Sequence, residues 1–113
     1  MTKARDFIKP GENILAIFTK GMHFELSVGN TGVTGEWDVD PSHARSVDRI
    51  LVYHQNNETS TNDLYVASLI RVDPARREGR YNLQLNHVQY VGITPLNWHD
   101  FAEAGANPIR YLP

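Results

Sequence analysis

The chain has 113 residues, of which 41% are hydrophobic and 21% are charged, and its formal net charge is −2. This composition is typical of a single globular domain, here residues 1–113, and it is too apolar for a disordered chain. The net charge excludes a global positive field that would bind nucleic acid nonspecifically, but it leaves room for a local basic patch. The absence of cysteine excludes disulfides, thiolate metal sites and cysteine nucleophiles.

No apolar run reaches the length of a signal peptide or of a membrane span, so we expect a cytoplasmic protein without a membrane partner. Apolar runs and alternating patterns predict strands over most of the chain. These strands are predicted at residues 14–18, 23–28, 33–39, 50–54, 64–72, 81–85 and 88–93. The polar run Gln55 to Asn62 is expected to form the long exposed tip of a hairpin.

Alternation within the third of these segments places Val33, Gly35, Trp37 and Val39 on one side of the strand. Directly after it, Asp40-Pro41-Ser42-His43 has the pattern of a cap followed by proline at the first helical position, which predicts a short helix.

A second helix is predicted at the end of the chain. Thr94 is its candidate cap, Pro95 its first residue and Gly105 its stop signal. Short strands joined by Gly, Pro and Asn turns indicate a mainly β (α+β) fold. We expect a small β-barrel of about five to seven strands with this C-terminal helix packed against it.

The residues give little support for catalysis. No serine lies in a strand-turn-helix elbow, and GNTGVTG lacks the Gly-Lys-Ser/Thr of a phosphate-binding loop. A set of Asp38, Asp40, His43 and His54 could ligate a metal, but its spacing matches no ligand pattern and suits a solvated surface. We therefore predict a binding protein without a cofactor, and keep a metal-dependent hydrolase as an alternative.

Arginines gather in one strand-turn-strand region, where guanidinium groups suit phosphate recognition. The predicted phosphate contacts are Arg71, Arg76, Arg77 and Arg80. Glu78 and Asp73 in the same region also fit a plain solvated turn.

Aromatic residues provide the strongest indication of a ligand, because a base can stack between their rings. Trp37 follows glycines at 29, 32 and 35, which permit close backbone approach, and is the leading candidate. Trp98 has helical spacing with Ala102, and we interpret it as a core residue, since tryptophans in small domains most often pack in the core. Strand tyrosines at 53, 65, 81 and 90 are further candidates.

The order KPGENILAIF, a glycine-rich turn with a tryptophan, DRILVYHQN, a polar tip and LYVASLIRVDP resembles the PUA superfamily, which includes the EVE, YTH and ASCH small β-barrels. The resemblance covers roughly the middle two-thirds of the chain. It implies binding of RNA, or reading of a modified and often methylated base in an aromatic cage. In that site Trp37 would be the leading cage residue, and Tyr53 or Trp98 would form the opposing wall. The edge of the base would be read by Ser27, Asn30 and Thr31.

We therefore expect a non-catalytic module that binds RNA or DNA, or a nucleotide, beside residues 29–37. An alternative is a small interaction protein of phage or defence systems that binds a protein or a signalling nucleotide. Its support is the acidic balance and the exposed hairpin tip.

Overall fold

The structure is a computed structural model that describes residues 9, 11–19, 24–56, 58–95 and 109–112. Its described part is mainly β, as predicted, with seven strands and one short helix. In chain order these are β1 (Ile14–Thr19), β2 (Phe24–Ser27), β3 (Thr31–Trp37), α1 (Pro41–Arg45), β4 (Arg49–Asn56), β5 (Thr61–Pro74), β6 (Tyr81–Pro95) and β7 (Ile109–Leu112).

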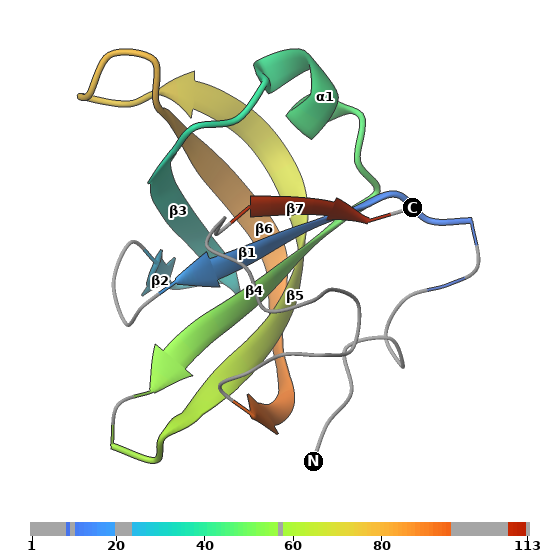
Figure 1. The fold of residues 1–113 in the computed structure, drawn as a ribbon, viewed down its shortest axis with the longest axis vertical. Coiled ribbons are helices and arrows are strands. Elements are labelled where there is room, and N and C mark those ends of the chain that lie inside the picture. Colours follow the sequence, from blue (N-terminus) through green and yellow to red (C-terminus); the bar gives the residue numbers. More distant parts are fainter. Residues whose placement is uncertain (1–8, 10, 20–23, 57, 96–108, 113) are drawn as a thin grey trace.

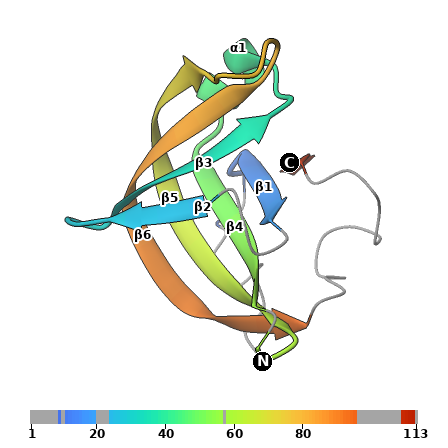
Figure 2. The ribbon, with the colours of Figure 1, turned by 90° about the vertical axis from the view of Figure 1, so that its left-hand side faces the viewer.

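All seven strands form one mixed sheet in the order β2-β3-β6-β5-β4-β1-β7 (Figure 1). β1 pairs with β4 in parallel, and every other neighbouring pair is antiparallel. β5 and β6 bend strongly along their lengths, so the sheet is curved (Figure 2). Among the described strands no pairing joins the edges β2 and β7, and the sheet is open there.

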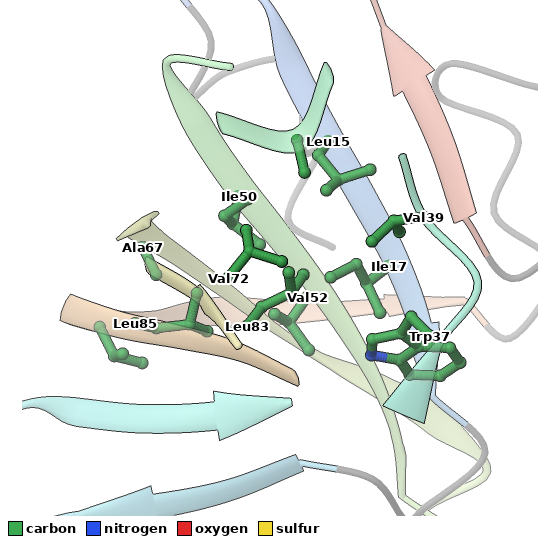
Figure 3. Close-up of a cluster of buried hydrophobic side chains, with 12 residues drawn as sticks. Leu15, Ile17, Trp37, Val39, Ile50, Val52, Ala67, Val72, Leu83 and Leu85 are labelled. Carbon is green, nitrogen blue, oxygen red and sulfur yellow. The ribbon is translucent and has the colours of Figure 1, made fainter. Parts of the chain in front are cut away.

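Alternate residues of β1 and β4 are buried on opposite faces of the sheet. The larger apolar cluster comprises Leu15, Ile17, Trp37, Val39, Ala44, Ile50, Val52, Ala67, Val72, Leu83, Leu85 and Val88 (Figure 3). The smaller cluster comprises Ile14, Ala16, Leu51, Tyr53, Leu64 and Val66. Because both faces are covered, β1 and β4 read in the sequence as continuous apolar runs, which is why they were predictable.

The short helix is confirmed. Asp40 has an extended backbone, and its side chain accepts a hydrogen bond of 3.0 Å from the backbone N–H of Ser42. Pro41 begins the helix, at a position where a backbone N–H would have no hydrogen-bond partner within the helix. Ala44 is fully buried and attaches α1 to the larger cluster.

The predicted alternation along β3 is wrong at its first half. The pairing of β3 with β6 shifts register between Thr34 and Trp37, so the strand changes phase there. Thr34 and Trp37 are consequently both buried, whereas Val33 is partly exposed and does not share the side of Trp37.

The two predicted strands at 81–85 and 88–93 are one strand, β6, which continues to Pro95. His87 adopts a positive φ of 50°, and the pairing of β6 with β5 shifts register at this position, between Val66 and Ser68 of β5. Thr94 and Pro95, which were expected to begin a helix, pair instead with Asn62 and Thr61 of β5. The rest of that predicted helix lies outside the described residues.

The tip of the β4–β5 hairpin is shorter than predicted, because β4 extends to Asn56 and β5 begins at Thr61. In the described part of the chain, no helix has the length and apolar character needed to cross a membrane.

Candidate aromatic ligand site

Trp37, the leading predicted ligand residue, is a core residue. Its side chain is only 7% exposed and belongs to the larger apolar cluster together with Ile17 and Val39 (Figure 3). Its indole Nε1–H donates a buried hydrogen bond of 2.9 Å to Thr34 Oγ1. The ring therefore has both its apolar surface and its polar group satisfied within the protein, and it offers no open face to a base.

The predicted edge-reading residues form the turn between β2 and β3. Ser27 pairs with Thr31 across this turn, and the Thr31 hydroxyl donates to the carbonyl of Val28 at 2.9 Å. Asn30 has a positive φ of 57°, and its carbonyl accepts from the backbone N–H of Val88 at 2.8 Å. Trp37 lies at the other end of β3, about 20 Å of strand away from Thr31. The structure does not bring these residues together.

Tyr53 is also a core residue, on the opposite face of the sheet from Trp37. It is 1% exposed and stacks on Phe18, with ring centroids 4.5 Å apart and an interplanar angle of 18°. Trp98 lies outside the described residues. The pocket expected from Trp37 and Tyr53 is therefore not formed, because the two rings belong to separate clusters.

The predicted phosphate-contacting arginines divide into two groups. Arg71 lies in β5, and its Nε–H donates to the carboxylate of Asp73 at 2.8 and 3.1 Å. Arg76, Arg77 and Arg80 lie in the turn between β5 and β6, where they are exposed or partly exposed. This turn places three arginines within five residues of the chain, at one end of the sheet.

A solvent-open hollow of about 470 Å³ lies beside this turn. Its lining residues are Glu25, Val33, Gly35, Glu36, Arg76 and Asn82. The hollow thus joins the glycine-rich segment to one of the predicted arginines. Two carboxylates also line it, so its charge does not favour an anion such as phosphate.

The residues of the metal-site alternative are not gathered. Asp40 caps α1 and His43 lies within that helix, whereas His54 lies near the far end of β4. The described residues contain no group of three or more His, Asp or Glu side chains placed to hold a metal ion.

The structure does assemble four rings from four strands, namely Phe24, His54, Tyr65 and Tyr90, here named the aromatic cluster. The Phe24 ring centroid lies 5.1 Å from that of Tyr65 and 5.4 Å from that of His54, and Tyr65 lies 5.4 Å from Tyr90. Each of these three pairs is inclined by 62°, an edge-to-face geometry favoured by aromatic rings.

The aromatic cluster depends on the curvature of the sheet. Three strand spacings separate β2 from β5, and in a flat sheet they would amount to about 14 Å. The observed 5.1 Å between Phe24 and Tyr65 means that the edge strand curls over the face carrying the larger apolar cluster. Tyr90 remains 53% exposed, so the aromatic cluster keeps one ring accessible to solvent.

Polar groups surround the aromatic cluster on the same face. Thr19 Oγ1 and His54 Nδ1 form a hydrogen bond. Asp63 lies directly opposite His54 in the β4–β5 ladder, and its Oδ2 accepts a hydrogen bond of 3.4 Å from the Asn56 amide.

Burial lowers the pKa of His54 below its ordinary 6.5, and the Asp63 carboxylate partly opposes this shift. The imidazole is therefore neutral at pH 7. Burial, Asp63 and Tyr90 all raise the pKa of the Tyr65 phenol, which stays protonated and can donate a hydrogen bond. Around the rings the arrangement thus offers a carboxylate acceptor, a phenol donor and a neutral imidazole.

Sequence reasoning identified Tyr65 and Tyr90 as strand aromatics but did not select them, and it assigned Phe24 and His54 no part in such a site. Tyr65 and Tyr90 are cross-strand partners in the β5–β6 ladder. That pairing was the one available signal, but it required the register of two irregular strands.

Comparisons of the chain with protein-family models, with curated proteins and with solved structures found no match.

Proposed function

We propose that this chain is a non-catalytic module that binds RNA, DNA or a nucleotide by stacking a base on the aromatic cluster. The observation that carries this proposal is the pair of Tyr65 and Tyr90, whose centroids lie 5.4 Å apart while Tyr90 is 53% exposed. A stacked base contributes about 1–3 kcal/mol of binding free energy, which is substantial for a small site.

Polar groups beside the rings suit the edge of a base. The Asp63 carboxylate accepts hydrogen bonds from exocyclic amino groups, and the Tyr65 phenol can donate one to a ring nitrogen or a carbonyl. Both groups are partly exposed. The base would therefore stack on Tyr90 with its edge turned toward Asp63.

The arginines of the β5–β6 turn would contact phosphates of the same ligand. Pro74, at the end of β5, lies nine residues beyond Tyr65, which is roughly 30 Å of strand. A single nucleotide does not span this length, but an oligonucleotide lying along β5 and β6 does. This arrangement favours a strand of several nucleotides over a mononucleotide as the natural ligand.

We also propose that the curved sheet is a small barrel of the PUA kind. The curl that carries Phe24 over to Tyr65 supports this proposal. The cage for a modified base would then be built from Phe24, Tyr65 and Tyr90 in place of Trp37.

Binding of fluorescein-labelled single-stranded RNA and DNA oligonucleotides, with and without methylated bases, would test the proposal. We expect Tyr90→Ala to weaken binding roughly tenfold, the loss of one stacked base. Ile70→Ala is the matched control, because Ile70 is 51% exposed in the neighbouring strand and lies outside the aromatic cluster.

Equal affinities of the Tyr90→Ala and Ile70→Ala variants would refute the role of the aromatic cluster. Failure of the wild-type protein to bind any of the oligonucleotides would refute nucleic acid as the ligand. Circular dichroism of both variants would establish that each retains the β-rich fold.

A protein partner is a second candidate, favoured by the edge strand β2. Leu26 is 53% exposed, and Val28, in the turn that follows, is 94% exposed. An extended peptide could pair with this edge by adding a strand. A salt titration separates the two candidates, since phosphate contacts through arginines weaken steeply with salt and an apolar strand addition does not.

A further inference from the structure

Asp63 places a negative charge beside the aromatic cluster. It lies on the same face of β5 as Tyr65, two residues away, and opposite His54 in the ladder with β4. Its carboxylate acts on both of these neighbours, since it opposes the pKa shift of His54 and adds to that of Tyr65. The negative charge of Asp63 therefore acts on the rings of His54 and Tyr65.

No cation neutralises this carboxylate within the part of the chain that the structure describes. The two ion pairs found there are Arg49–Glu12 and Arg71–Asp73, and neither involves Asp63. The neighbouring imidazole is neutral at pH 7 because of its lowered pKa. Asn56 occupies one acceptor position of Asp63, and a carboxylate offers about four, so it can accept further hydrogen bonds.

A carboxylate and the faces of aromatic rings both attract cations. The face of a tyrosine or phenylalanine ring is the negative part of its quadrupole and binds a cation placed over it. A neutral base gains stacking and hydrogen bonds, whereas a positively charged base gains the electrostatic attraction of the rings and of Asp63 as well.

We propose that the aromatic cluster and Asp63 together select a base that carries a positive charge, such as an N-alkylated purine, over its neutral counterpart. This inference rests on the proposed function and adds the chemical class of the ligand. A cationic peptide is the rival occupant, but a basic peptide long enough to extend along β5 would meet the arginines of the β5–β6 turn, which repel it and attract phosphates.

Two methylated mononucleotides of identical mass provide the test. In 1-methyladenosine 5′-monophosphate the base is protonated at neutral pH, whereas in N6-methyladenosine 5′-monophosphate it is neutral. Dissociation constants would be measured by isothermal titration calorimetry at pH 7 for wild type, Asp63→Asn and Asp73→Asn. Asp73 is the matched control, a partly exposed carboxylate at the other end of β5 that pairs with Arg71.

We expect the 1-methyl nucleotide to bind wild type roughly five- to thirtyfold more tightly than the N6-methyl isomer. Asp63→Asn should weaken binding of the 1-methyl nucleotide by about fivefold or more and leave the N6-methyl nucleotide within about twofold. Asp73→Asn should preserve both values.

Equal or tighter binding of the neutral isomer would overturn the charge selectivity while leaving base stacking intact. If Asp63→Asn weakened the binding of both nucleotides equally, the charge selectivity would also be overturned, since Asp63 would then act through hydrogen bonds and not through its charge. Tighter binding of a trimethyl-lysine peptide than of either nucleotide would overturn the choice of a base as the ligand. Binding of no oligonucleotide and neither nucleotide would instead refute the proposed function itself.

Discussion

Substitution of Trp37 by alanine distinguishes a core role from a ligand role for this residue. Trp37 is 7% exposed, belongs to the larger apolar cluster and donates its indole N–H to Thr34 at 2.9 Å. Alanine removes the whole ring and leaves a cavity among Ile17, Val39 and their neighbours. We therefore expect Trp37→Ala to act on the stability of the fold.

The expected magnitude is large relative to the stability of the domain. Truncation of a buried Trp or Phe to Ala costs about 3–5 kcal/mol. At about 0.05–0.15 kcal/mol per residue, a chain of 113 residues has a free energy of unfolding of roughly 6–17 kcal/mol. Trp37→Ala thus removes a large part of it, whereas Tyr90→Ala, at a side chain 53% exposed, should cost about 1 kcal/mol.

Urea denaturation followed by far-ultraviolet circular dichroism would measure both variants, since this signal does not depend on the indole. Trp37→Phe is an intermediate variant that keeps an aromatic ring and loses the hydrogen bond to Thr34, at an expected cost of about 1–3 kcal/mol. The reasoning would be refuted if Trp37→Ala unfolded within about 1 kcal/mol of wild type and yet abolished oligonucleotide binding. The indole would then be a ligand contact.

Two further predictions concern positions around the sheet. Gly35→Ala would place a Cβ 2.8 Å from Asn82 Cγ and 3.1 Å from Asn82 Cα, so urea denaturation should show a loss of about 1–3 kcal/mol that Asn82→Ala partly restores; a loss unchanged in the double variant would contradict this clash. The pKa of His54, measured by NMR titration, should lie below 6.5 and fall further in Asp63→Asn, which removes the opposing charge. Because the unfolded imidazole binds its proton more tightly than the folded one, stability should decrease as pH falls through 6.5 toward the folded pKa and stay unaffected by this group above pH 7; a pKa at or above 6.5 would contradict the burial argument.

Local signals in the sequence were sufficient for the elements whose stability is local or whose burial is complete. The run at 14–18 and the run at 50–54 lie in β1 and β4, which are buried on both faces and carry no competing pattern. The cap at Asp40 and the proline after it predicted α1, because their effect extends over one turn of chain.

Elsewhere, irregular strand pairing made the predictions from local sequence patterns wrong. Strict alternation assigns Val33 and Trp37 to one face, but the register shift between Thr34 and Trp37 moves them to different surroundings. Thr94 and Pro95 carry a local helix-start pattern, yet pairing with β5 holds both in β6. In each case a tertiary ladder outweighed a local preference, and nothing within a few residues reveals that ladder.

The unexpected burial of Trp37 follows from the same cause. Glycines around a tryptophan indicate space for a ligand when the strand alternates regularly, since the ring then lies on the glycine-rich side. After the register shift, Trp37 turns into the core, and Gly35 instead accommodates the side chain of Asn82. The glycine therefore permits packing between β3 and β6, and the aromatic surface arises in another part of the sheet.

The aromatic cluster is itself a product of curvature. Four strand spacings separate β2 from β4, about 19 Å in a flat sheet, and yet Phe24 and His54 lie 5.4 Å apart. The β5–β6 ladder contains three register shifts, between Leu64 and Tyr65, between Val66 and Ser68, and between Leu69 and Arg71. Bulges increase the twist and bend of the strands that contain them, so these three shifts account for the curl. The first of them lies directly next to Tyr65 and its cross-strand partner Tyr90, so the irregularity that bends the sheet also places the two rings that carry the proposed site.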